Sequence, residues 1–358
     1  MNIESVLAAI AVLAVVIFVH ELGHFLVAKW CDVEVQTFSM GFGPTIVSKT
    51  VGETTYRLAA IPFGGYVKMA GQDDAENDPA GDPSRGFSAK TLGQRAAIVA
   101  AGPAVNVVFA FVLLAFIFSV YGAPFPSENA LVGQVLPDRP AAEAGLVRGD
   151  MITAIDGQPV EKWQQLVESV RGSEGRELVL TVKSAEGVER AVEVQPRLTP
   201  DRDYLGEVIG EAWLIGIAPG AAYRKVGAFE SLKLAGQQTW FYTGMIFETL
   251  SRLFQRRVPM KDLAGPVGIM QEAARQASHG FDSLLRFIAV ISVNLGIINI
   301  LPIPVLDGGH LTFFAFELIR GKPLSLRVRE LALQAGVFLL VALMVLVVYN
   351  DISRNLTG

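Results

Sequence analysis

Apolar residues run along this chain in four stretches that are long enough to cross a lipid bilayer. They cover about 5–28, 96–121, 283–306 and 331–349, and a membrane-spanning helix needs about 20 such residues. The segment 228–254 is apolar only in patches, because charged and amide side chains interrupt it at roughly helical spacing. That pattern is typical of an amphipathic helix at a membrane interface, so we predict four spans and not five.

A water-soluble segment separates the second and third spans. From about 125 to 220, short apolar runs alternate with glycine and aspartate turns. They predict a short helix and a strand over 140–157, a helix over 163–171 and a strand over 177–183. The predicted fold class is therefore an α-helical polytopic membrane protein with an inserted α+β domain.

The pattern divides the chain into four expected domains. Residues 1–121 hold the first two spans and 122–220 hold the soluble insertion. Amphipathic interfacial helices are expected over 221–282, and the last two spans over 283–358.

The connection between the first two spans has a β-type pattern. Residues 33–70 contain alternating runs joined by glycine turns, which predict a membrane-associated β-hairpin or small sheet. The apolar tip of this segment, 61–66, indicates partial entry into the membrane. An acidic stretch with proline and glycine follows at 73–85 and predicts a mobile linker.

Composition narrows the possible classes of function. The chain of 358 residues is 51% hydrophobic and only 18% charged, which is too apolar for an ordinary soluble protein. A formal net charge of −5 without a block of Lys or Arg argues against nucleic-acid partners. Cys31 stands alone and is expected to be a packing residue. The N-terminus lacks the pattern of a cleavable signal, so the first span is expected to stay in the membrane.

Positive residues near the span ends predict the orientation. They gather between the first and second spans and again between the third and fourth: Lys29, Lys49, Arg57, Lys68, Lys90, Arg95, and then Arg320, Lys322, Arg327 and Arg329. Both connections should therefore be cytoplasmic. This orientation places the two termini and the insertion 122–282 outside the cytoplasm.

The first span contains a candidate zinc site. Residues 20–24 read His-Glu-Leu-Gly-His, an HExxH pattern. On a helix, His20 and His24 lie one turn apart on the same face and can bind one Zn²⁺, with Glu21 beside them as a base. Titratable groups in a membrane-length apolar run are costly unless they face protein, water or a metal. The pattern predicts a zinc hydrolase site inside the bilayer, near its cytoplasmic side.

A catalytic zinc usually takes a third protein ligand. The extended metzincin pattern would need glycine and histidine where this chain has Val27 and Trp30, so that pattern is excluded. Asp307 follows two prolines spaced by one residue at the inner end of the third span, and unwound backbone in a bilayer must line a cavity or pack in protein. It lies at the depth of the two histidines. Without the HExxH pattern, Asp307 would be interpreted as a turn residue before two glycines. His310 is a weaker candidate for the third zinc ligand.

These motifs together resemble a known family. HELGH at 20–24 with NILPIPVLDGG at 299–309 is similar to the paired motifs of the site-2 proteases, which are intramembrane zinc metalloproteases. The sequences GGYV at 64–67 and AGP at 101–103 followed by Asn106 are similar to the bacterial RseP-type branch, as is a PDZ-like insertion. The resemblance covers nearly the whole chain. Only one PDZ-like domain can be placed, whereas some members carry two.

The resemblance implies a zinc site and a substrate site. It implies that His20, His24 and Asp307 bind one Zn²⁺ and that Glu21 is the general base. The implied substrate-binding residues are Asn299, Asn294, Gly64 and Gly65. Without the resemblance, the two amides would be ordinary bridges between helices in lipid. The implied substrates are single-pass proteins of the bacterial cytoplasmic membrane, either anti-sigma factors or remnant signal peptides.

Two other functions stay open at the level of sequence. One is a membrane-bound PDZ binding module with an inactive site, against which the intact HExxH and Asp307 speak. The other is a transporter that uses intramembrane His and Asp as a cation path, against which the lack of an internal repeat speaks. The PDZ-like domain could receive a peptide C-terminus at the strand over 214–217, or it could filter substrates by size.

Overall fold

The computed structural model describes residues 3–72, 82–127, 129–203, 207–255, 257 and 265–357. Most of the predicted linker 73–85 lies outside these residues, and its end forms the short 3-10 helix η1 (Pro83–Arg85), with η2 (Phe87–Ala89) after it. The chain divides into two compact units. The helical unit comprises Met1–Ile117, Ala228–Phe254 and Pro259–Gly358, and the inserted unit comprises Phe118–Gly227 and Gln255–Val258.

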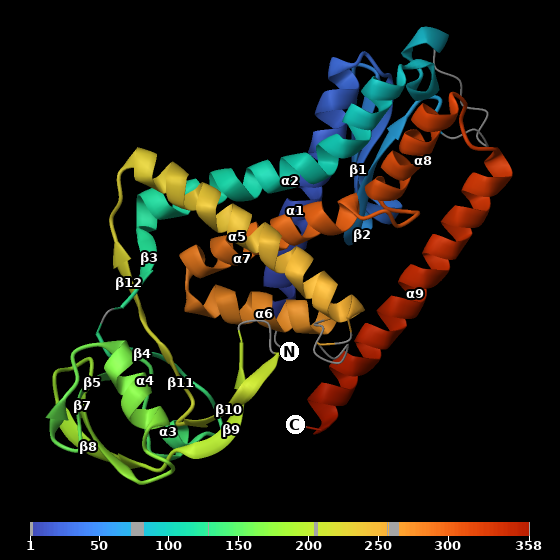
Figure 1. Cartoon of the computed structure of the whole chain (residues 1–358). Coiled ribbons are helices and arrows are strands. Elements are labelled where there is room, and N and C mark those ends of the chain that lie inside the picture. The colour runs from blue at the N-terminus through green and yellow to red at the C-terminus, as the bar shows by residue number, and fades with distance from the viewer. Residues whose placement is uncertain are drawn as a thin grey trace. The chain divides into compact units, whose positions relative to one another are not determined.

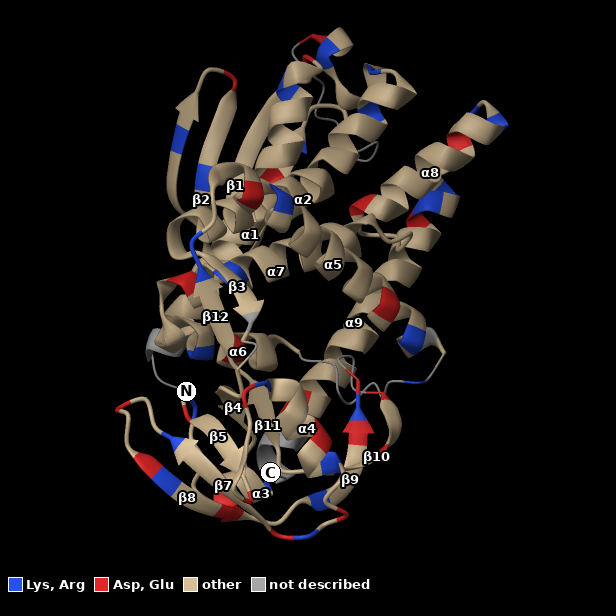
Figure 2. Ribbon diagram, turned by 60° about the vertical axis from the view of Figure 1, so that its left-hand side comes forward, with Lys and Arg blue, Asp and Glu red and all other residues tan. Residues whose placement is uncertain are grey.

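Four helices of the described chain are long and apolar enough to cross a membrane (Figure 1). They are α1 (Ile3–Trp30), α2 (Leu92–Tyr121), α7 (Phe281–Ile300) and α9 (Leu326–Thr357). Helix α5 (Ala228–Phe254) is not among them, as its charge pattern predicts. Figure 2 shows that charged residues are sparse along α7 and frequent on strand β8 (Glu189–Val194) of the inserted unit. The predicted number of spans is confirmed.

The third apolar stretch ends earlier than the sequence suggests. Helix α7 ends at Ile300, and a short non-helical segment, 301–306, connects it to α8 (Asp307–Arg320). The two prolines of this segment lack the backbone N–H that helix continuation needs, which explains the break. The helix that starts at Asp307 was not expected from the sequence.

The segment after α1 forms the predicted β-hairpin. Strands β1 (Val35–Val51) and β2 (Thr54–Met69) pair antiparallel around a turn at Gly52, whose φ of 62° suits glycine. The end of β2 returns along the start of β1, with Gly65 opposite Met40. Buried Phe38 and Val67 of the hairpin pack together with Ile98 of α2, so the hairpin is attached to the helices through an apolar core.

An ion cluster fixes the turn of this hairpin. The Glu53 carboxylate accepts hydrogen bonds from the Arg85 guanidinium at 2.7 and 3.0 Å and from the Lys29 ammonium. Arg85 and then Lys29 lower the pKa of the Glu53 carboxyl to about 2, so it is charged at neutral pH. The turn is thereby held to the end of α1 and to η1.

Helix α6 (Pro266–His279) packs between the apolar helices. Its Ala273 is buried with Val12 and Val16 of α1 and with Ile288 of α7. Phe229 and Trp240 on α5 are largely exposed, at 85% and 78%. The interfacial position of α5 and α6 stays a prediction. The helical part of this region begins at Ala228 and not at 221, because residues 221–224 form a strand of the inserted unit.

Far along the chain, α9 is joined to α6 by one carboxylate. Asp351, only 2% exposed, accepts hydrogen bonds from the backbone N–H groups of Gly265, Val267 and Gly268, each at 3.1 Å. The first N–H groups of a helix have no partner within the helix, so an outside carboxylate satisfies them and meets the positive end of the helix dipole.

The inserted unit is an α+β domain with its own core. Its helices are α3 (Pro140–Glu143) and α4 (Trp163–Arg171). Its strands are β3 (Ala123–Pro126), β4 (Val132–Val135), β5 (Met151–Ile155), β6 (Gln158–Pro159), β7 (Leu178–Lys183), β8, β9 (Arg197–Arg202), β10 (Val208–Leu214), β11 (Ile217–Pro219) and β12 (Ala221–Arg224). Four strands form a sheet in the order β6-β5-β7-β8, and β9 pairs with β10, β4 with β11 and β3 with β12. Ile152, Leu166 and Leu180 are buried in its core. The predicted fold class with an inserted α+β domain is confirmed, and the bounds 122–220 stay a prediction.

Candidate active site

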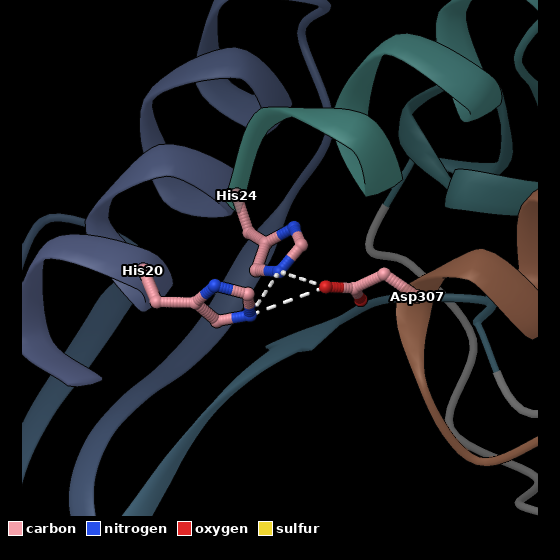
Figure 3. Close-up of side chains that lie close together, drawn as sticks. All are labelled: His20, His24 and Asp307. Atoms are coloured by element: carbon pink, nitrogen blue, oxygen red, sulfur yellow. Dashed lines mark hydrogen bonds and ion pairs between the residues drawn. The ribbon is translucent and has the colours of Figure 1, made fainter. Parts of the chain in front are cut away.

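Two histidines and one aspartate converge inside the helical unit. His20 and His24 lie on successive turns of α1, and their Nε2 atoms are 3.2 Å apart. Oδ2 of Asp307, at the first residue of α8, is 3.2 Å from Nε2 of His20 and 3.5 Å from Nε2 of His24. Figure 3 shows the three side chains pointing toward one another. His20 and Asp307, which are far apart in the sequence, thus lie in one cluster.

The turn before α8 places Asp307 and requires its two glycines. Val305, just before the helix, has a φ of 91°, a conformation that residues other than glycine rarely adopt. A Cβ on Gly308 would lie 2.2 Å from the carbonyl oxygens of Ile300 and Leu301, and a Cβ on Gly309 would lie 2.5 Å from that of Ile303. Only glycine allows the new helix to start this close to the end of the old one.

Helix α2 packs very closely against the part of α1 that carries the two histidines. A Cβ on Gly23 would lie 2.6 Å from the carbonyl oxygen of Ala101, and a Cβ on Gly102 would lie 2.3 Å from Nε2 of His24. Nδ1 of His24 lies 2.9 Å from the carbonyl oxygen of Ile98. Because a carbonyl can only accept, this nitrogen carries the proton, and Nε2 of His24 is left with its lone pair facing the cluster.

The cluster fits a tetrahedral zinc ion. Bonds of about 2.0–2.2 Å from zinc to nitrogen or oxygen ligands put neighbouring ligand atoms about 3.3–3.6 Å apart. The three separations here, 3.2, 3.2 and 3.5 Å, are close to that spacing. Oδ2 of Asp307 is buried without a hydrogen bond within the described residues, as expected for an atom that binds a metal. Two imidazoles and a carboxylate are a donor set that catalytic zinc uses.

A cavity of about 820 Å³ opens beside the cluster. It is lined by Glu21 and Asn299, and the Nδ2 atom of Asn299 is 3.3 Å from Nε2 of His20. Gly65 of β2 also lines it, and a Cβ at this position would be 3.0 Å from Cγ of Glu21. The predicted base and two of the predicted substrate residues therefore surround one space.

Two of the predicted substrate residues do not line this cavity, and the competing histidine does. The residues that line the cavity include neither Gly64 nor Asn294. Gly64 has a φ of 109° and shapes the strand next to Gly65. His310 lines the cavity one turn after Asp307 and is not part of the ligand cluster.

Sequence reasoning missed the parts of the site that come from α2. The carbonyl of Ile98 and the side chain of Asn106 both contact histidines of the cluster. Asn106 appeared only as part of a family motif, yet an amide in the middle of an apolar span is a signal that could have pointed to this role. A backbone carbonyl leaves no such signal.

Helices of membrane length and composition surround the two histidines of the HExxH pattern and an aspartate. This combination is typical of one class of protein, the membrane-embedded, metal-dependent hydrolases. The family comparison agrees: the model of Peptidase family M50 matches residues 8–343, and the chain belongs to this family. It is therefore a zinc metalloprotease of the site-2 type, and a multi-pass protein of the bacterial inner membrane. Zinc is the cofactor that this membership implies.

Relatives match over nearly their whole length. A protein of Brucella suis named putative zinc metalloprotease is 34% identical over 98% of this chain and 95% of its own. The regulator of sigma-E protease RseP of Salmonella typhimurium is 32% identical over 97% of this chain and 98% of its own. Among solved structures, the PDZ domain of an SdrC-like protein from Listeria monocytogenes matches at 24% identity, over 27% of this chain and 93% of that one, with a TM-score of 0.21.

Proposed function

We propose that the protein is an intramembrane endopeptidase that hydrolyses a peptide bond within or near the membrane span of a single-pass protein. His20, His24 and Asp307 are the proposed zinc ligands. The observation that carries the proposal is the tetrahedral spacing of their three ligand atoms between helices of membrane length and composition. A bound zinc would polarise the scissile carbonyl and make water a stronger nucleophile.

Glu21 is the proposed general base. Its side chain lines the cavity next to the ligand cluster, so its carboxylate can reach a water placed there. It takes the proton of the attacking water and later delivers it to the leaving amine, which keeps the proton count balanced. No other acidic residue lies within the HExxH segment.

The wall of the cavity is suited to bind a substrate whose backbone is extended. A membrane helix hides its peptide bonds in i→i−4 hydrogen bonds, so the substrate must unwind locally before cleavage. The end of β2 pairs with β1 on one side, and Gly65 to Val67 of this end line the cavity. We assign direct substrate contacts to this strand and to Asn299, and keep Gly64 and Asn294 as candidates at longer range.

The substrates and the orientation belong to the proposal as well. The name of the Salmonella relative, regulator of sigma-E protease, favours anti-sigma-like membrane proteins, with remnant signal peptides as the alternative. The active site is proposed to lie near the cytoplasmic side, with both termini outside the cytoplasm, because of the positive residues between the spans. The inserted unit would either receive peptide C-termini or limit access by size.

Replacing the base while keeping the ligands tests the function. We expect Glu21→Gln to lower the cleavage rate of a single-span reporter by at least about 100-fold, with zinc content unchanged. His20→Ala should lose both zinc and cleavage, and Glu168→Gln on α4 is the matched control that should change neither. Cleavage by Glu21→Gln at the rate of the wild type would overturn the assignment.

A further inference from the structure

Asn106 of α2 is an amide buried beside a proposed zinc ligand. It is 0% exposed, and its Nδ2 atom lies 3.3 Å from Nδ1 of His20. The other end of the amide, Oδ1, is buried without any hydrogen-bond partner among the described residues. A fully buried amide with an unsatisfied oxygen needs a physical explanation.

The chemistry of a histidine ligand supplies this explanation. Nε2 of His20 is the atom that faces Asp307 and His24, so it must present a lone pair to a metal. The neutral ring then carries its proton on Nδ1, which needs an acceptor. His24 has such an acceptor in the carbonyl of Ile98. For His20, the polar group that faces Nδ1 is the amide of Asn106.

The two ends of an amide have nearly the same shape, and the hydrogen-bond network decides which is which. Turning the amide by 180° gives Oδ1 a donor, the N–H of His20, and moves the NH2 group to the place that Oδ1 occupied. From this we propose that Asn106 is a positioning residue: its Oδ1 accepts the Nδ1 proton of His20 and keeps Nε2 free to bind zinc. This inference rests on the proposed function, because it assumes that His20 is a ligand.

The backbone around Asn106 is held in place by a third helix. The hydroxyl of Ser292 on α7 donates to the backbone carbonyl of Asn106 at 2.9 Å, and Ser292 is also fully buried. A Cβ on Gly296 would lie 2.8 Å from the carbonyl oxygen of Pro103, so α7 and α2 touch backbone to backbone. The amide is thus fixed between α7 and the ligand on α1. A rigidly held acceptor orients a ligand better than a mobile one.

Two substitutions at this position separate an acceptor from a donor. Asn106→Asp leaves only acceptor oxygens, whereas Asn106→Leu leaves a side chain of similar size without polar atoms. We expect the leucine variant of the full-length protein in detergent to bind zinc about 10–100-fold more weakly in competition with a chelator. The aspartate variant should bind zinc at least as tightly as the wild type. Cobalt(II) absorption spectra of both variants report the ligand geometry independently of cleavage.

The controls distinguish the possible failures. Val108→Ala, a change at an exposed residue of the same helix, should leave zinc affinity unchanged. If the wild type and His20→Ala bind zinc equally, the proposed function itself fails. If His20→Ala loses zinc but Asn106→Leu keeps it, only the positioning role fails. Loss of zinc in Asn106→Asp also overturns the inference, because a donor would then be required. If the leucine variant does not fold, the zinc affinity of the aspartate variant decides whether Asn106 acts as an acceptor.

Discussion

At the scale of single residues, the cluster depends on glycines as well as on the three proposed zinc ligands. His24 can point at Asp307 only because α2 has no side chain at Gly102, and α8 can start at Asp307 only because Gly308 and Gly309 follow it. Such close backbone approach is possible only at glycine. These glycines therefore set the distances between the three proposed ligand atoms.

Adding one methyl group to α2 tests this dependence. We expect Gly102→Ala to weaken zinc binding by about tenfold or more, because a Cβ would lie 2.3 Å from Nε2 of His24 and the ring must turn away. The matched control is Gly93→Ala on the same helix, where a Cβ meets nothing within 4 Å. Chelator competition measures both. Equal affinity of the two variants would contradict the packing argument.

The sequence predicted the cluster residues through local spacing and motif order. His20, Glu21 and His24 follow from one helical turn, since residues four apart share a face. Asp307 needed the proline break and the family resemblance. The amide of Asn106 in an apolar span indicates a buried polar role, but its contact with His20 could not be predicted, because an apolar helix does not indicate which of its faces meets α1 until both are packed.

At the scale of elements, α9 is tied to the rest of the helical unit at two points. Gly336 lies against the proline segment, where a Cβ would be 2.2 Å from the carbonyl oxygen of Pro304. Asp351, more than three turns later, caps the start of α6. One contact is next to the segment that carries Asp307, and the other is at the far end of the helix.

Weakening the cap should loosen the start of α6. In Asp351→Asn one acceptor oxygen remains where the carboxylate offered two. Because hydrogen bonds to a charged group contribute about 1.5–3 kcal/mol, we expect amide exchange at Gly265, Val267 and Gly268 to become at least about tenfold faster. Hydrogen exchange of the full-length protein measures this. Asp282→Asn in the first turn of α7 serves as the control, and unchanged exchange in both variants would exclude the cap.

Helices and strands could be predicted where a single strong sequence pattern indicated them. The long apolar runs gave the spans, and alternation with glycine turns gave the hairpin. Helix α8 was missed, because its start depends on the fit of Gly308 under the carbonyls of Ile300 and Leu301, which is a tertiary contact. Strand β12 was missed because its partner β3 lies about 100 residues earlier in the chain.

At the scale of the whole molecule, the inserted unit has the properties of an independent domain. It has its own apolar core, and its first and last strands pair with each other, with Ala123 opposite Arg224. The ends of the segment are therefore adjacent in space. A segment with its own core and adjacent ends can fold without the rest of the chain.

Expression of residues 122–227 alone tests this independence. We expect a soluble fragment with a single cooperative unfolding transition in denaturant, followed by circular dichroism. Leu180→Ala, at a fully buried position, should lower its free energy of unfolding by about 2–5 kcal/mol. Val188→Ala, at a position 61% exposed, should change it by less than about 0.5 kcal/mol. A fragment that aggregates or unfolds without a transition would contradict the prediction.

The closed pair of β3 and β12 also bears on how such proteins diversify. An inserted segment whose two ends are adjacent in space can be duplicated, lost or exchanged without changing the distance between the elements that flank it. Such a segment can therefore change in evolution while the cluster of His20, His24 and Asp307 stays the same.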